Sequence, residues 1–295
     1  MPAAPTAAPV PDRWFRATPD SSGLSRSRLL TRSLIPLSVL DERIRFYEGL
    51  TGTAADLRMP IPDFGGLELA AVGNILLIAS IRPFTDIQRR TAHSVIVPSL
   101  KEQLDRLLDA GATVLEPAEN ILPGSRARVR LGDGTIAELV EHRPLPGEHP
   151  RPAPYSVAGD TTPDLLVRRA VSAADFAATV ARYESALDTP SHVRVRLDGA
   201  FPVELALIGG LLVVGTDGPE FTRSADVRLA LVTSVPLESA YGERLSGSTA
   251  DRHHLVTLRD GTRAEVWDGS VGLRPPSPSG PGAGAAGAPR SGPLG

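Results

Sequence analysis

The chain has 295 residues, a net charge of −3 at pH 7 and a hydrophobic fraction of 41%, enough for two domains with packed cores. The slight acidity argues against a nucleic-acid partner or an anionic membrane surface, and no apolar run reaches the roughly 18 residues of a membrane span. The absence of cysteine excludes disulfides and cysteine nucleophiles and fits a reducing, cytoplasmic location. Arginine greatly outnumbers lysine, and this bias, together with abundant Ala, Pro and Gly, is typical of GC-rich bacterial genomes.

Three stretches are rich in Pro, Gly, Ala and Ser and indicate segments without a core of their own: residues 1–27, 144–162 and 270–295. They carry too few large apolar side chains to offset the entropy lost on ordering. We therefore expect a disordered N-terminal arm, a Pro-rich linker and a disordered C-terminal tail. Between them, residues 28–143 and 163–269 are expected to form two folded domains.

The first domain opens with an apolar strand at 29–37, followed by a helix that Ser38 can cap and Gly52 can end. A meander of apolar strands follows, and then the same order begins again at residues 93–100. It finishes with a hairpin whose turn, Asp133-Gly134, readily accepts positive backbone dihedrals. The domain is thus predicted to be two β-α-β-β-β units in tandem.

The second domain repeats this scheme. Residues 204–216 match residues 68–80, which lie 136 positions earlier. The dipeptide Tyr47-Glu48 recurs as Tyr183-Glu184 at the same offset. Both domains close on similar hairpins, LGDGTIAELVEH in the first and LRDGTRAEVWDG in the second. The match at a fixed offset indicates a duplication rather than shared composition. Only the fourth unit is eroded, because residues 236–253 are too few for a full helix and strand.

The four β-α-β-β-β units, the helix ending FYEGLTG and the closing pattern DGTxAE resemble the vicinal oxygen chelate superfamily of glyoxalases, extradiol dioxygenases and bleomycin-resistance proteins. The resemblance implies an α+β fold in which each domain is a curved mixed sheet, a cup, with helices on its convex face. It also implies a small-molecule ligand or substrate and two domains that pack on each other, in a monomer or a homodimer. It leaves the activity open, because the superfamily contains several kinds of enzyme and non-catalytic drug-binding proteins.

The resemblance also indicates where metal ligands would stand: a histidine in the first strand of each unit and a glutamate in the last. The four histidine positions hold Arg32, Ala92, Leu166 and Val227, and the four glutamate positions hold Ile78, Glu138, Val214 and Glu265. A divalent metal needs at least three converging protein ligands, so we expect neither a metal nor another cofactor. If a metal were present, His93, one place from a ligand position, would be the first alternative ligand.

Arg32 and Glu138 are the leading site candidates. Side chains alternate along a strand, so Ile136, Glu138 and Val140 share one face. A carboxylate in mid-strand needs a partner, a ligand or an open cleft, and Arg32 is expected to face the same cup. The two residues suit either a structural ion pair or an anchor for a carboxylate or enolate ligand.

In the second domain, Glu265 and Trp267 repeat this layout. Arg194 and Arg196 alternate with apolar residues on another strand and are expected to share a face with Glu265. Two interpretations of that face are open: it is exposed to solvent, or it lines an anion pocket. Trp267 likewise either packs in the core or stacks against a ligand ring.

The sequence therefore favours a protein that binds a small organic molecule, of the glyoxalase or bleomycin-resistance type, with a role in bacterial secondary metabolism or resistance. The alternative is a metal-independent isomerase, lyase or cyclase. It would use Glu138 as a base, if burial raises the pKa of that carboxyl, and Arg32 to stabilise an oxyanion. A metal-dependent glyoxalase or dioxygenase ranks third.

Overall fold

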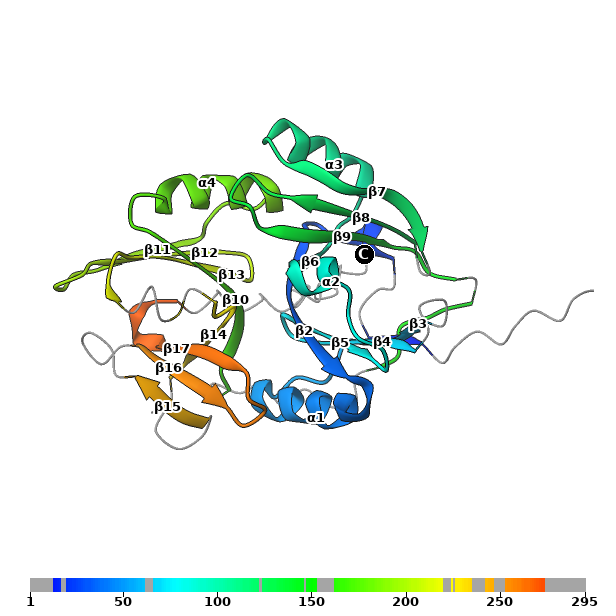
Figure 1. Cartoon of the computed structure of the whole chain (residues 1–295), viewed down its shortest axis with the longest axis horizontal. Helices are drawn as coiled ribbons and strands as arrows, with labels where there is room; N and C mark the ends of the chain where they lie inside the picture. The colour runs from blue at the N-terminus through cyan, green and yellow to red at the C-terminus, as the bar shows by residue number, and fades with distance from the viewer. Residues whose placement is uncertain are drawn as a thin grey trace, which may run out of the picture.

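The computed structural model describes residues 13–16, 20–61, 66–121, 124–145, 147–152, 162–219, 224, 226–234, 242–246 and 253–273. These residues form two curled mixed sheets with helices packed against them, so the predicted α+β fold is confirmed (Figure 1). Within these ranges, no helix has the length and apolarity needed to cross a membrane.

The first sheet has nine strands in the order β1-β3-β4-β5-β2-β6-β9-β8-β7. Its central strands β2 and β6 are antiparallel, and each runs parallel to the last strand of its own unit, β5 or β9. The strands are β1 (Trp14–Phe15), β2 (Arg28–Pro36), β3 (Leu57–Ile61), β4 (Leu67–Val72), β5 (Ile75–Ser80), β6 (Thr91–Ile96), β7 (Thr113–Ile121), β8 (Gly124–Arg130) and β9 (Ile136–His142). Its helices are α1 (Leu40–Thr51), α2 (Asp86–Arg90) and α3 (Leu100–Asp109).

The second sheet repeats the pattern in the order β11-β12-β13-β10-β14-β17-β16-β15. Its elements are β10 (Asp164–Val171), α4 (Phe176–Leu187), β11 (Val193–Leu197), β12 (Val203–Ile208), β13 (Leu211–Gly215), β14 (Leu229–Thr233), β15 (Gly242–Ser246), β16 (His253–Leu258) and β17 (Arg263–Asp268). The duplication persists in the strand register, since Arg32 pairs with Leu76 and Arg168 pairs with Leu212. Much of the eroded fourth unit lies outside the described residues.

Local signals explain most element ends. Gly52 ends α1 in the left-handed conformation, with φ 64°, as predicted. In both closing turns the aspartate side chain accepts from a threonine amide, Asp133 from Thr135 and Asp260 from Thr262, each at 2.9 Å. Ser38 is not the cap of α1, because a short 3-10 turn precedes that helix and Val39 occupies the cap position.

The two domains pack on each other through the faces opposite their cups. One apolar cluster joins Leu139 of β9 to Val180 of α4, and another joins Leu77 of β5 to Leu231 of β14. The duplicated tyrosines then reach across the boundary. The Tyr47 hydroxyl donates to Asp260 at 2.9 Å, and the Tyr183 hydroxyl donates to Asp133 at 3.4 Å. Each helix thus contacts the closing hairpin of the other domain.

The expected domain edges need correction. Part of the predicted arm belongs to the first domain, because β1 pairs with β3, Phe15 is buried, and the buried Ser21 hydroxyl donates to the Val97 carbonyl at 2.7 Å. At the other end, Val271 and Leu273 are buried in the second domain's core, beyond the predicted end at residue 269. A few apolar side chains are sufficient here because they complete cores built by other elements. Residues 1–12, 153–161 and 274–295 lie outside the described residues.

Candidate functional site

The concave face of the first sheet encloses a pocket, here called the first cup. Its wall is mainly aliphatic: Leu30, Leu57, Met59, Ile61, Leu67, Leu69, Leu76, Ile78, Ile96, Ile121 and Val140. Polar groups gather on one side: Arg32, Gln88, Ser94, Arg126, Arg128, Glu138 and His142. An apolar cavity with a few convergent polar groups is the usual form of a small-molecule site.

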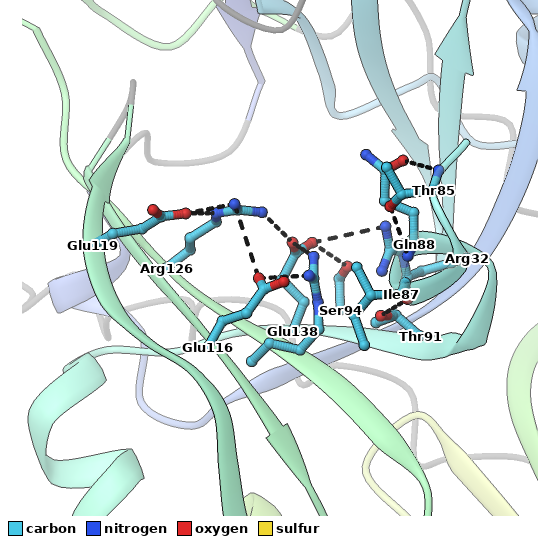
Figure 2. A network of polar contacts seen from close by, with 11 residues as sticks. Arg32, Thr85, Ile87, Gln88, Thr91, Ser94, Glu116, Glu119, Arg126 and Glu138 are labelled. Atoms are coloured by element: carbon cyan, nitrogen blue, oxygen red, sulfur yellow. Dashed lines mark hydrogen bonds and ion pairs between the residues drawn. The ribbon is translucent and has the colours of Figure 1, made fainter. Parts of the chain in front are cut away.

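Glu138 lies at the centre of the polar side (Figure 2). Strand pairing places Arg128 directly across from it on β8 and Ser94 beside it on β6. Arg128 Nη2 donates to Glu138 Oε1 at 2.7 Å and Arg126 Nη1 donates to the same oxygen at 3.2 Å. The Ser94 hydroxyl donates to Oε2 at 3.4 Å. The carboxylate is therefore held by three neighbours.

Arg32 faces the same cup but is bonded far less completely. Its Nη2 is 4.0 Å from Glu138 Oε2, which is an ion pair without a hydrogen bond, and its side chain is only 3% exposed. Its buried Nε and Nη1 have no hydrogen-bond partner among the described residues. Burial lowers the pKa of Arg32, and Glu138 only partly opposes this shift. Unpartnered buried donors cost about 1–3 kcal/mol each, so Arg32 is the group in this cup most in need of an acceptor.

The electrostatics of Glu138 correct one expectation from the sequence. Burial raises the pKa of its carboxyl, but the charges of Arg32, Arg128 and Arg126 together outweigh burial and hold that pKa below its usual value. Glu138 is therefore a stabilised carboxylate at neutral pH, and a weaker base than an unpaired buried glutamate.

The structure separates the other first-domain candidates. Val140 lines the first cup, whereas Ile136, at the start of β9, lines a groove between the domains. His93 also lines that groove, because it alternates with Ser94 along β6 and so points away from Glu138. Burial, with the charges of Arg228 and Arg169, lowers the pKa of His93 to about 3. Displacement by one residue reverses the face of a strand, so His93 and Glu138 are not brought together.

The concave face of the second sheet, here called the second cup, is filled by side chains of the second domain. Arg168 Nη2 donates to Glu265 Oε1 at 3.2 Å, and both residues are buried. Trp267 Nε1 donates to Glu265 Oε2 at 3.0 Å, and the Trp267 ring stacks on His253 with 4.4 Å between centroids. Arg168 also donates to the Ser224 carbonyl at 2.8 Å. This ion pair is saturated by the protein itself.

Arg194 and Arg196 do not join Glu265. Both are exposed on the edge strand β11, where Arg194 pairs with Glu184 and Arg196 pairs with Asp198. The residue that faces Glu265 is Arg168, which the sequence reading missed by placing the equivalent position two residues earlier. The signal was present, because Arg168 stands 136 positions after Arg32, at the offset of the duplication.

The polar side of the first cup does not fit a divalent metal. It offers the single carboxylate of Glu138, surrounded by the guanidinium groups of Arg32, Arg126 and Arg128. Across the part of the chain that the structure describes, no group of three or more His, Cys, Asp or Glu side chains converges. A cation placed beside Glu138 would face three positive charges. The absence of a bound metal stays a prediction for elemental analysis.

No protein-family model matches the sequence, and no curated protein matches it at a significant level. Among solved structures, an uncharacterized protein from Methanosarcina mazei is 31% identical, with 40% of this chain and 94% of that chain covered and a TM-score of 0.35. A variant of 4-hydroxymandelate synthase from Streptomyces coelicolor is 16% identical, with 84% and 92% covered and a TM-score of 0.46. The 2,2',3-trihydroxybiphenyl 1,2-dioxygenase from Sphingomonas wittichii is 12% identical, with 83% of this chain and 91% of that chain covered and a TM-score of 0.47.

The strand order agrees with the fold that the resemblance to the vicinal oxygen chelate superfamily implies. In each sheet the first strands of the two units are antiparallel neighbours at the centre, β2 with β6 and β10 with β14. The solved structures transfer neither residues nor activity to this chain at such identities.

Proposed function

We propose that the chain binds a small organic molecule in the first cup, with an oxygen atom of the ligand on Arg32. The observation that supports this is a pair of buried donors, Nε and Nη1, that have no partner among the described residues, on a side chain that lines the cup. A ligand oxygen would satisfy donors that otherwise cost free energy. Arg126 and Arg128, by contrast, already bind Glu116, Glu119 and Glu138.

The chemistry of the cup suggests the ligand class. A guanidinium fork recognises a carboxylate, an enolate or a phenolate through two parallel hydrogen bonds. The opposite wall is aliphatic and comes mainly from β3, β4 and β5. The proposed ligand therefore has an apolar body and one weakly acidic or carbonyl head group. Sequestration of such a metabolite, as the resemblance to bleomycin-resistance proteins suggests, is the role we propose for the chain.

Binding without turnover is favoured over catalysis by the state of Glu138. A general base works best when its pKa lies near the working pH, whereas arginine neighbours lower the pKa of Glu138. Its contacts suit a residue that orients Arg126 and Arg128. Glu138 is thus a weaker base than the isomerase, lyase or cyclase alternative requires.

The test combines ligand discovery with matched variants. Native mass spectrometry of the purified chain would seek a retained molecule, and thermal shift would compare decanoate with 1-decanol, which share an apolar body and differ in the head group. We expect decanoate to bind better, and Arg32→Met to weaken its binding at least tenfold, about 1.4 kcal/mol. Arg196→Met, on the exposed edge strand, serves as the control and should bind like the wild type.

Two outcomes would overturn the proposal. Equal binding by Arg32→Met and Arg196→Met would place the ligand elsewhere. Chemical conversion of a retained ligand, seen by liquid chromatography with mass spectrometry and lost in Glu138→Gln, would show an enzyme instead of a binding protein.

A further inference from the structure

A second cavity lies between the two domains, on the side where β6 and β14 begin. We call it the arginine groove, because Arg89, Arg90, Arg169 and Arg228 line it. The closing turn of the first domain forms another edge, and the space is about 1060 Å³ including its open side. The groove is distinct from the first cup, which opens on the concave face of the sheet.

The groove holds more positive charge than the protein neutralises. Arg169 pairs with Asp133 at 3.1 Å, and Asp226, also on the lining, binds Arg263 at 2.8 Å. Neither Arg90 nor Arg228 forms an ion pair or a side-chain hydrogen bond with any residue that the structure describes. Two exposed guanidinium groups therefore line one groove without an acidic partner among the described residues.

Repulsion inside the groove supports the same conclusion. Burial and the nearby positive charge of Arg169 lower the pKa of Arg228, and Asp226 opposes this only in part. Like charges in a partly desolvated site raise the free energy of the empty state. An anion between Arg169 and Arg228 would remove that repulsion.

Buried donors complete the site. His93 lines the groove, is 2% exposed, and has an Nδ1 atom without a partner among the described residues. In the Nδ1-protonated tautomer of the neutral imidazole, this atom is a hydrogen-bond donor. The Nε of Arg169 is likewise buried and has no described partner. The contact between the two domains provides no described hydrogen-bond partner for His93 Nδ1 or Arg169 Nε.

We propose that the arginine groove binds a phosphate-bearing small molecule, with phosphate oxygens on Arg90, Arg169 and Arg228 and a hydrogen bond from His93. A phosphate group suits the groove better than a single carboxylate, because it brings more negative charge and oxygens that diverge toward several guanidinium groups. This site is independent of the function proposed for the first cup.

The test uses isothermal titration calorimetry with inorganic phosphate and with glucose 6-phosphate, at constant ionic strength set with NaCl. We expect binding to the wild-type chain, and at least a tenfold loss in Arg228→Gln and in Arg90→Gln. Arg196→Gln, which removes an exposed arginine far from the groove, should bind like the wild type.

The two probes distinguish the source of the phosphate. Tighter binding of glucose 6-phosphate would assign the groove to phosphate esters, and tighter binding of the inorganic ion would assign it to free phosphate. Absence of heat beyond the NaCl control for both probes would overturn the proposal. Equal weakening in Arg228→Gln and Arg196→Gln would overturn it as well, because the effect would then reflect net charge alone.

Discussion

The two cups come from one duplicated pattern, yet one is open and the other is filled. Arg32 and Arg168 occupy equivalent register positions, and so do Glu138 and Glu265, since Ser94 pairs with Glu138 as Ala230 pairs with Glu265. The difference begins two residues after each glutamate. There the first cup has Val140, which lines an open pocket, and the second has Trp267, which is fully buried.

The tryptophan changes what the ion pair can do. Trp267 donates to Glu265 and stacks on His253, and Arg168 reaches backbone carbonyls, so that all these groups are satisfied within the protein. Arg32 retains two buried donors without a described partner. The comparison shows that the same arginine and glutamate stabilise the fold where their bonds are complete, and remain available to a ligand where the bonds are incomplete.

The largest expected effect contrasts the two arginines. Arg168→Met leaves Glu265 as a buried carboxylate without its cation, which typically costs about 3–5 kcal/mol. Arg32→Met removes a desolvated and poorly bonded charge and leaves Glu138 with Arg126 and Arg128, so we expect a change below about 1 kcal/mol. Urea unfolding followed by circular dichroism measures both. Similar losses in the two variants would show that Arg32 is as structural as Arg168.

The second prediction converts the first cup into the second. Val140→Trp should place an indole beside Glu138, as Trp267 lies beside Glu265, and fill the pocket. We expect binding of a first-cup ligand such as decanoate to weaken by about a hundredfold, roughly 2.8 kcal/mol, with little loss of stability. Val140→Leu adds less volume and is the matched control. Unchanged decanoate binding in Val140→Trp would mean that the ligand occupies another site.

The sequence predicted the fold well because the duplication supplied two copies of each signal. Short segments of the sequence determine the closing Asp-Gly turns, the helix end at Gly52 and the repeated tyrosines. Such local features can be predicted without knowledge of the tertiary contacts. The face on which Glu138 and Val140 lie followed from strand alternation alone.

What the sequence did not predict depends on contacts between distant segments. Arg168 was missed because the resemblance indicated Leu166 as the first-strand position, whereas the 136-residue offset from Arg32 leads to Arg168. The lowered pKa of Glu138 required Arg126 and Arg128, which lie on a neighbouring strand and face inward. Strand β1 was missed because its two residues gain stability from distant segments, through pairing with β3 and the packing of Phe15 in the core.

The third prediction concerns acid stability and the face opposite the first cup. Burial, with the charges of Arg228 and Arg169, lowers the pKa of His93 from 6.5 to about 3, although Asp133 opposes the shift. Below pH 6.5, His93 therefore binds a proton in the unfolded chain but not in the folded chain. The contribution of His93 to the free energy of unfolding is fully present above that pH and falls by about 1.4 kcal/mol per pH unit as the pH decreases toward 4.

Urea unfolding at several pH values between 6.5 and 4.5 tests this slope. We expect His93→Gln to reduce the slope of unfolding free energy against pH by the equivalent of about one proton. The remaining slope then comes from His142, whose pKa burial lowers to about 4. An unaltered slope in His93→Gln would mean that His93 accepts a proton in the folded chain.

The smallest effect tests the symmetry of the contact between domains. Tyr47 donates to Asp260 at 2.9 Å and lies 3.2 Å from the Thr262 hydroxyl, whereas the equivalent Tyr183 contacts Asp133 at 3.4 Å. A hydrogen bond to a charged acceptor contributes more when it is short, so Tyr47→Phe should cost about 1–2 kcal/mol and Tyr183→Phe about half of that. Both phenylalanines keep the apolar packing, so that the difference in unfolding free energy isolates the hydroxyl groups. A larger loss in Tyr183→Phe would reverse the expected order. It would mean that the Asp133 turn, which borders the arginine groove, depends on its tyrosine more than the Asp260 turn does.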